Sequence, residues 1–251
     1  MPVPAPASKV LLLCVAEMLG LLSFGPEGWG DDIASGVLVT VSLALATLPL
    51  GLAAGFFVAL GKQSEEPSLR LASNVYTTLF RGLPELLTLF LVYYGAQIGL
   101  QQLIVLFGGS SGIEINSFVA GMVALGVVFS SYASETFLSA FRAIPRGQYE
   151  GGYAIGLSKW QTMRLVILPQ LVRIALPGLS NLWLILLKDT SLVSVIGLAD
   201  IIRQTGIAAR VTREAFLFFG VACLLYLALA ILSSFAFAAI ERWAGKTEPA
   251  R

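Results

Sequence analysis

The sequence contains no histidine, and its charged residues are few. Only 12% of its 251 residues are Asp, Glu, Lys or Arg, about half of the roughly 25% found in average soluble domains. Without histidine, catalytic triads, histidine-ligated zinc, haem ligation and imidazole proton relays are excluded in their usual forms. The two cysteines, Cys14 and Cys223, lie far apart in apolar runs. They cannot form a cysteine metal site and are expected to be small buried residues.

The charges that are present nearly cancel. Sixteen basic and 15 acidic side chains leave a formal net charge of +1, which excludes a polybasic nucleic-acid-binding protein and an acidic disordered tail. By contrast, 57% of the residues are hydrophobic. This composition predicts an integral membrane protein whose function depends on a few charged positions.

Five apolar runs are long enough to cross a bilayer. A spanning helix needs about 20 mainly apolar residues, so we expect an all-α membrane core of five helices. In the first run, Gly51 and Gly55 form a small-xxx-small pattern that lets another helix approach closely, although glycine is also simply frequent in membrane helices. The five runs cover residues 33–60, 86–107, 115–140, 171–187 and 215–240.

The first 32 residues fit this core less well. Residues 10–24 form a shorter apolar run that contains Glu17, to which we assign no function. We expect an extra N-terminal membrane helix there; a cleaved signal peptide or an incorrectly assigned start are the alternatives. The predicted organisation is an N-terminal apolar segment with an acidic connection over 1–32, a membrane domain over 33–243 and a tail over 244–251.

The basic residues indicate the orientation of the helices, because Lys and Arg favour cytoplasmic connections. We expect the connections after the first and third runs and the C-terminus to be cytoplasmic, and the amphipathic segment 200–214 to be external. The predicted cytoplasmic side holds ten basic residues and the external side holds three. The ten are Lys62, Arg70, Arg142, Arg146, Lys159, Arg164, Arg173, Arg242, Lys246 and Arg251, and the three are Arg203, Arg210 and Arg213.

Residues 141–170 make a connection too long to lack structure of its own. We expect a short helix over 148–155 that ends at Gly156 in the left-handed conformation. Ser158 is expected to cap a second helix, and Pro169 to end that helix before the next membrane crossing. The segment is therefore predicted to be a folded cytoplasmic projection suited to docking another protein.

This connection also carries a motif. Glu150-Gly151-Gly152-x-x-x-Gly156 is followed after nine residues by Val166-x-Leu168-Pro169. The pattern resembles the E-A-A-x-x-x-G…I-x-L-P coupling loop of bacterial ATP-binding cassette (ABC) importer permeases, which sits in a cleft of the cytoplasmic ATPase subunit. Gly151 and Gly152 replace two alanines, and each glycine weakens a helix by roughly 1 kcal/mol. The resemblance implies that the ATPase-coupling residues are Glu150, Gly151, Gly152, Gly156, Leu157, Leu168 and Pro169.

Three further segments resemble the polar amino-acid permeases of the same family. They are residues 76–85, which include the R-G-x-P signature, residues 132–141 and residues 187–198. The whole resemblance covers about residues 33–243, and it is nearest to the histidine, basic amino-acid and opine branch. It implies a five-helix type I ABC importer core, multi-pass in the bacterial inner membrane, that transports a polar or basic amino acid or an opine.

The resemblance also implies partners. The importer would be completed by two cytoplasmic ATPase subunits, a second permease (identical or related) and an external amino-acid-binding protein. The chain itself would contact membrane lipid, and no nucleic acid is expected. Gly61-Lys62 lacks the earlier glycine and the following Ser or Thr of a phosphate-binding loop. We therefore expect ATP and magnesium on the ATPase partner, no cofactor on this chain and no enzymatic activity of its own.

Ionisable residues inside a membrane cost about 2.5–3.5 kcal/mol each on insertion scales, so they indicate a cavity or a partner. At the end of the fourth run, we expect Asp189, with Lys188 and Ser191, to line the substrate path. An acid there could hold an ammonium or guanidinium group. The alternative is a helix-end pair that reaches to the membrane interface.

Two further places hold such residues. Pro84 disfavours helix at Leu83, and a helix broken there could offer its dipole to an α-carboxylate; an interfacial turn is the alternative. Glu135, late in the third run, is expected to be structural or part of a cytoplasmic gate rather than a substrate contact. The residues assigned to the path at the break are Arg81, Gly82, Pro84 and Glu85.

Two other classes of function stay open. An ion-gradient-driven secondary transporter or channel would need no ATPase partner, but the inverted repeats usual in that class are not evident. A membrane-embedded enzyme could use Ser191 and Lys188 as a nucleophile–base pair, but no second motif supports catalysis. The permease subunit of an ABC importer is therefore the leading hypothesis.

Overall fold

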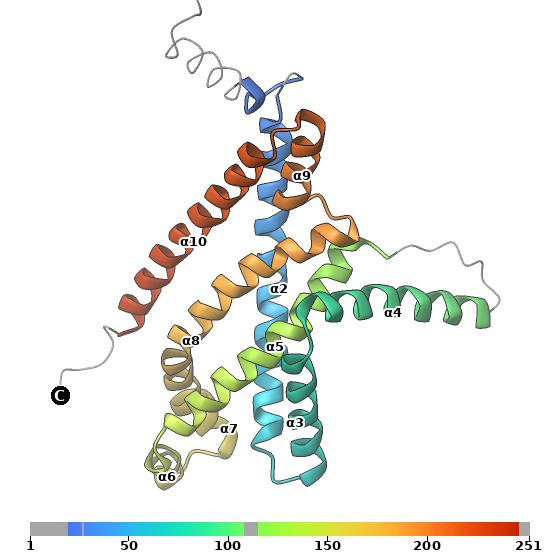
Figure 1. The fold of residues 1–251 in the computed structure, drawn as a ribbon. Coiled ribbons are helices and arrows are strands. Elements are labelled where there is room, and N and C mark those ends of the chain that lie inside the picture. The colour runs from blue at the N-terminus through green and yellow to red at the C-terminus, as the bar shows by residue number, and fades with distance from the viewer. Residues whose placement is uncertain (1–19, 27, 108–114, 246–251) are drawn as a thin grey trace, which may run out of the picture.

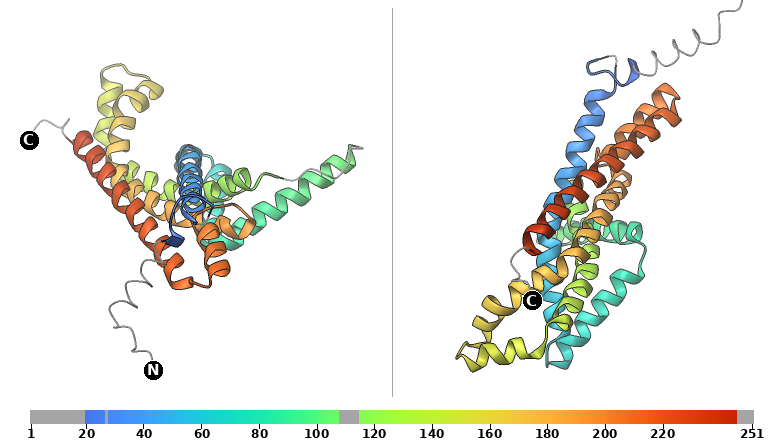
Figure 2. Two further views of the ribbon diagram at one scale, coloured as in Figure 1. Left: turned by 90° about the horizontal axis from the view of Figure 1, so that it is seen from above. Right: turned by 90° about the vertical axis from the view of Figure 1, so that its left-hand side faces the viewer.

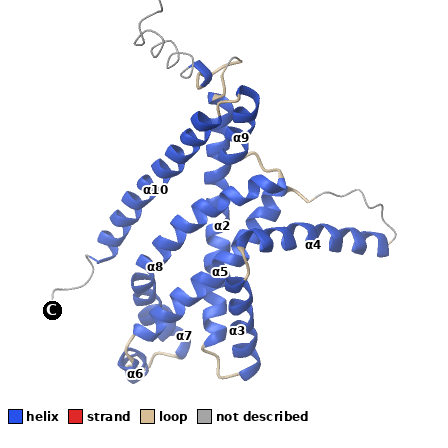
Figure 3. Cartoon of the chain, viewed as in Figure 1, coloured by secondary structure: helices blue, strands red, loops and turns tan. Residues whose placement is uncertain are grey.

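The computed structural model describes residues 20–26, 28–107 and 115–245, which contain helices and turns and no strand (Figures 1 and 3). Most of the predicted N-terminal helix, with Cys14 and Glu17, lies outside these residues and stays a prediction. The elements are α2 (Gly30–Lys62), α3 (Pro67–Gly82), α4 (Glu85–Leu106), α5 (Ser117–Ala143), α6 (Arg146–Ala154), α7 (Lys159–Thr162), the π-helix η1 (Met163–Ile167), α8 (Leu168–Asp189), the 3-10 helix η2 (Thr190–Ile196), α9 (Ile201–Thr212) and α10 (Ala215–Gly245).

Five helical segments are long and apolar enough to cross a membrane, and they correspond to the five predicted runs. The prediction of an all-α five-helix core is therefore confirmed. Four of the segments are α2, α4, α5 and α10, and the fifth is the continuous stretch from Lys159 to Ile196.

The predicted helix end at Pro169 is wrong. α7, η1 and α8 follow one another without a gap, and the Leu168 amide donates to the Met163 carbonyl in a π-helical turn. Pro169 then occupies the first turn of α8, where the wider π turn accommodates its missing N–H and its ring. The coupling connection and the fourth membrane helix are therefore joined as one helix.

α2 and α5 are in close contact through the two glycines of the first run. A Cβ atom at Gly51 would lie 2.5 Å from Phe129 Cδ1, and one at Gly55 would lie 2.8 Å from Ala133 Cβ and 2.9 Å from the Ser130 carbonyl oxygen. Neither position has room for a larger side chain without movement of α5. The small-residue contact face predicted from Gly51 and Gly55 is confirmed.

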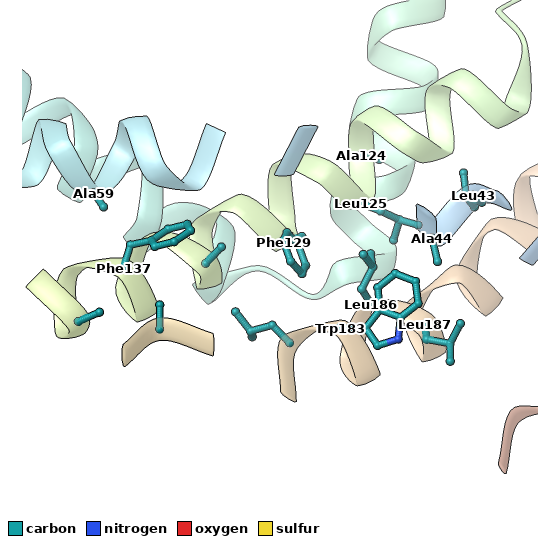
Figure 4. Packing of buried hydrophobic residues seen from close by; sticks show 14 of the residues in the cluster. Leu43, Ala44, Ala59, Ala124, Leu125, Phe129, Phe137, Trp183, Leu186 and Leu187 are labelled. Carbon is teal, nitrogen blue, oxygen red and sulfur yellow. The ribbon is translucent and has the colours of Figure 1, made fainter. Parts of the chain in front are cut away.

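Buried side chains of α2, α5 and α8 form the main core (Figure 4). Leu43 of α2, Phe129 of α5 and Leu186 of α8 belong to it. α5 is the most buried of the long helices, whereas α4 and α10 are mostly exposed. Cys223 lies on the exposed surface of α10, so the expectation that it is buried is wrong: a helix that faces lipid can carry small apolar residues on its outside.

The connections gather at two opposite ends of the bundle (Figures 1 and 2). α6, α7 and the α2–α3 connection lie at one end, and α9 and the start of α2 lie at the other. α9 and its C-cap carry the three arginines predicted to be external. Lys62, Arg70, Arg142, Arg146, Lys159 and Arg164 lie on or beside the connections at the first end, away from these three arginines, and which end faces the cytoplasm stays a prediction.

Replacement of Gly55 by alanine tests the contact between α2 and α5. The new Cβ would meet a backbone carbonyl that cannot turn aside, so we expect the free energy of unfolding to fall by about 1–3 kcal/mol. The control is Gly220→Ala on α10, where nothing lies within 4 Å of the new Cβ; it should be neutral or stabilising by up to about 1 kcal/mol. Unfolding of the purified protein in detergent measures both, and equal effects would contradict the close packing.

Candidate functional site

The connection between α5 and α8 folds into a helical hairpin. α6 ends in a left-handed Gly156 (φ 84°), and the Leu157 amide donates to the Gly152 carbonyl at 3.0 Å, as in a Schellman cap. Ser158 and Gln161 then form a reciprocal capping box at the start of α7. The left-handed glycine and the serine cap are therefore confirmed, while the first helix begins two residues earlier than expected, at Arg146.

The two glycines that replace alanines in the motif have different surroundings. A Cβ at Gly151 would meet nothing within 4 Å, whereas one at Gly152 would lie 2.6 Å from Thr162 Cγ2. Thr162 is fully buried between α6 and the start of η1. The close approach of the two arms of the hairpin therefore explains Gly152, and nothing in the structure explains Gly151.

The α6–α7 hairpin presents apolar side chains at its surface. Tyr153, Ile155 and Trp160 are all exposed, and Glu150 is exposed beside them. Leu168 and Pro169 lie at the base of the hairpin, where α8 begins. Exposed apolar residues with a charged neighbour are typical of a surface that another protein covers.

The helix break at Pro84 separates α3 from α4. Leu83 has an extended conformation (φ −92°, ψ 143°), and Glu85 lies in the first turn of α4, where the helix dipole stabilises a carboxylate. The charges of Glu85 and Asp189 are close enough to act on each other, Lys188 acts on Asp189 with the opposite sign, and both carboxylates are half-buried. Two neighbouring carboxylates can attract a cationic group.

The neighbours of Asp189 differ in exposure. Lys188 is exposed and Ser191, in η2, is half-buried, as expected because successive helical residues are about 100° apart. Asp189 is thus the member of this group that the structure brings to Glu85.

Glu135 is the centre of an ion cluster that joins three helices. Its Oε1 atom pairs with Lys62 Nζ at the end of α2 and, at 3.2 Å, with Arg81 Nη1 near the end of α3. The Arg81 guanidinium also lies 5.5 Å from the centroid of the Tyr132 ring, a cation–π distance. The Lys62 side chain is only 5% exposed, so it depends on Glu135 for its counter-charge.

A cavity of about 540 Å³ adjoins this ion cluster. Two positive charges and one negative charge leave an excess of positive charge, which suits a small molecule with a carboxylate. Most of the lining is polar and comes from α2, α3 and α5. The lining residues are Lys62, Asn74, Thr77, Thr78, Arg81, Gly82, Tyr132 and Glu135.

Tyr76 fastens α3 to α5 beside the cavity. Its hydroxyl donates to the Val127 carbonyl at 3.1 Å and lies 2.6 Å from Ser130 Oγ. Burial raises the pKa of Tyr76, and the hydrogen bond with Ser130 lowers it by less. The phenol therefore stays neutral and keeps its proton for the hydrogen bond.

The structure divides the predicted path residues into two groups. Glu85 faces Asp189, whereas Arg81 and Gly82 belong with Glu135. Lys62 was not predicted as a site residue, although a lysine that directly ends an uncharged run is a signal that it needs a partner. No group of three His, Cys, Asp or Glu side chains that could hold a metal occurs in the described part of the chain.

Glu135→Gln tests the dependence of Lys62 on its counter-ion. The substitution leaves a buried ammonium group unpaired, and we expect the free energy of unfolding to fall by about 3–5 kcal/mol. Adding Lys62→Met removes the stranded charge, so the double variant should recover much of this loss. Unfolding in detergent measures both, and a double variant as unstable as the single one would show that the ion pair is not the cause.

The arrangement of five membrane helices and one hairpin has known relatives. A family model described as "Binding-protein-dependent transport system inner membrane component" matches residues 48–246. The nopaline transport system permease protein NocQ of Agrobacterium fabrum is 41% identical over 91% of this chain and 97% of the relative. The histidine/lysine/arginine/ornithine transport system permease protein HisQ of Escherichia coli is 37% identical over 86% of this chain and 94% of the relative.

Solved structures share the fold. The crystal structure of an amino acid ABC transporter with histidines matches with a TM-score of 0.72 and 31% identity, over 85% of this chain and 94% of that one. The inward-facing MetNI methionine ABC transporter matches with a TM-score of 0.68 at 20% identity, over 85% and 96% of the two chains, and bears on the fold alone. The chain is therefore a multi-pass membrane protein that belongs to the family of binding-protein-dependent transport system inner membrane components.

Proposed function

We propose that the chain is the permease subunit of an ABC importer for a polar or basic amino acid or an opine. The α6–α7 hairpin, with its left-handed Gly156 and capping box, carries this proposal, because it is a rigid docking element at one end of a membrane bundle. Relatives named for nopaline, octopine and histidine/lysine/arginine/ornithine transport support the substrate class.

The proposal requires three kinds of partner. Two ATPase subunits, which would bind ATP and magnesium, dock on the hairpins of two permeases through Glu150, Ile155 and Trp160. A second permease is needed because five helices do not enclose a path, and the exposed α4 has free surface for it. An external binding protein would deliver the substrate at the α9 end.

The two charged groups have complementary roles on the path. Glu85 and Asp189 would receive the ammonium or guanidinium group of the substrate, because a cation relieves their mutual repulsion. The cavity beside Arg81 would receive the α-carboxylate. A substrate with charges of both signs would therefore have two oppositely charged places to bind.

Coupling would act through the continuous helix from Lys159 to Asp189. This helix is about 45 Å long at 1.5 Å per residue, and it joins the hairpin directly to the carboxylate that faces Glu85. When ATP closes the ATPase pair, a displacement of the hairpin is transmitted along the helix to the substrate path.

Glu150→Lys tests the coupling assignment. A reversed charge on the docking surface should abolish uptake and the ATPase activity stimulated by the binding protein, because the hairpin no longer seats on the ATPase. Gly151→Ala, where the new methyl group meets nothing within 4 Å, is the matched control and should leave both activities intact. The measurement uses the assembled complex in proteoliposomes. Persistence of both activities in Glu150→Lys, or uptake without any ATPase, would refute the proposal.

Asp189→Asn tests the substrate path. Loss of a charge-assisted hydrogen bond worth about 1.5–3 kcal/mol should raise the KM for a cationic amino acid on the order of 10- to 100-fold. Lys188→Gln, at the exposed neighbour, should change KM little. Radiolabelled arginine uptake measures both, and an unchanged KM for Asp189→Asn would remove this residue from the site.

A further inference from the structure

A buried carboxyl group, Asp200, lies where α2, η2, α9 and α10 meet. Asp200 is the N-cap of α9 and is fully buried, although the sequence predicts an external amphipathic segment here. Tyr226 of α10 faces it, and the hydroxyls of Thr40 and Thr190, both fully buried, lie near Tyr226. The cluster belongs to the end of the bundle opposite the α6–α7 hairpin (Figure 1).

Two polar atoms of this cluster have no hydrogen-bond partner among the described residues. Asp200 Oδ1 accepts a hydrogen bond from the Arg203 amide at 2.9 Å, but Oδ2 accepts none. The Tyr226 hydroxyl is likewise buried and unpaired. Buried polar atoms without partners are rare and costly, and an ionised carboxylate oxygen without a donor is the costlier of these two.

The threonine hydroxyls are already engaged with the backbone. Thr40 Oγ1 accepts from the Ile201 amide at 3.3 Å, and Thr190 Oγ1 donates to the Leu187 carbonyl at 2.7 Å. The only hydroxyl proton of Thr190 is therefore already engaged, so Thr190 can only accept a further hydrogen bond.

No cation pairs with the Asp200 carboxyl group in the described part of the chain. Arg203 directs Nη1 to the Ser194 carbonyl at 3.3 Å. Arg203 of α9 and Tyr226 of α10 are the charged or titratable groups that interact with Asp200, while α2 and η2 contribute hydroxyls. Burial raises the pKa of Asp200 to about 6, and the backbone amides of Arg203, Ile202 and Asp200, together with the Arg203 charge, oppose this only in part.

We propose that Asp200 and Tyr226, with Thr40 and Thr190, form a proton-binding site that locks the α9 end of the permease. A proton from external water binds Oδ2 and makes the carboxyl group neutral. The neutral carboxyl group needs no counter-ion, and a small movement of Tyr226 would let the new O–H donate to the Tyr226 oxygen while the Tyr226 O–H donates towards the threonine oxygens. When the proton returns to water, a buried negative charge is left without a counter-ion.

Water reaches this charge only if α9 moves away from α2. A Cβ at Gly36 of α2 would lie 2.9 Å from the Asp200 carbonyl oxygen, so the two helices touch through their backbones. Thr190 directly follows Asp189, the carboxylate that faces Glu85. Protonation therefore holds α9, α2 and η2 together, and deprotonation favours their separation next to the substrate path.

The difference between the folded-state and unfolded-state pKa of Asp200 determines how stability changes with pH. The carboxyl pKa is 3.8 without the protein environment and about 6 in the fold, so the folded state binds the proton more tightly. This contribution to stability is complete below about pH 4 and is lost as the pH rises through about 6. A shift of about two pKa units changes the unfolding equilibrium on the order of 100-fold.

Asp200→Asn is the decisive variant, because an amide keeps the size of the neutral carboxyl group but does not titrate. In the assembled transporter, we expect wild type and variant to unfold at nearly the same temperature below about pH 4, where the carboxyl group is protonated in both the folded and the unfolded state. At pH 7.5 the variant should be the more stable, as it carries no buried charge. Asp32→Asn, at an exposed carboxylate of the same end, is the control and should show no such crossover.

Two results would overturn the proposal. If Asp200→Asn is less stable than wild type by the same amount at every pH, Asp200 is an ionised helix cap. If sodium chloride, compared with choline chloride, stabilises wild type but not the variant at pH 7.5, the site binds a metal cation rather than a proton.

A transport measurement extends the test and rests on the proposed function. In proteoliposomes with fixed internal pH, lowering the external pH from 7.5 to 5.5 should slow uptake by wild type, while Asp200→Asn should stay at the lower rate throughout. Equal external-pH dependence of the two would refute the lock. Absence of wild-type uptake in the complete complex would refute the proposed function and leave the stability result standing.

Discussion

The closeness of α2 to α5 decides where charge can be placed in this bundle. Gly51 and Gly55 let the two backbones approach until a Cβ at Gly55 would contact α5. At this spacing Lys62 on α2 reaches Glu135 on α5, and α3, which turns back beside α2, brings Arg81 to the same carboxylate. Charges in surroundings of low dielectric are tolerated when they neutralise one another. The polar cavity next to them thus depends on an apolar contact between two glycines and their neighbours.

The π turn Met163–Ile167 is the second local feature on which the structure depends, because it joins the hairpin to the membrane helix α8. It lets a proline stand in the first turn of α8 without ending the helix, since the Leu168 amide donates to the Met163 carbonyl. A break at Pro169 would leave the hairpin hinged on the bundle. Because the helix is continuous, the capped hairpin at Gly156 and Ser158 is joined to Asp189 without an intervening loop.

Features that depend on neighbours in sequence could be predicted, and those that depend on neighbours in space could not. The five helices follow from apolar length, the hairpin caps from glycine and serine at fixed offsets, and the break at Pro84 from proline geometry. By contrast, Arg81 and Glu85 are four residues apart, yet they join different clusters because α3 and α4 diverge at that break. Asp200 was predicted only to lie in an external segment, because its neighbours in sequence do not show that it is fully buried in the fold.

The acidic groups inside this protein differ in how their charge is compensated, and that difference separates structure from function. Glu135 pairs with two cations of its own chain, so its charge is compensated without a ligand. Glu85 and Asp189 face each other, and the Lys188 side chain beside them is exposed; their repulsion is relieved when a cationic substrate arrives and returns when it leaves. Such a site gains binding energy from its own unfavourable ground state. Asp200 is fully buried and forms no salt bridge among the described residues, so in the proposed site a proton rather than a side chain compensates its charge.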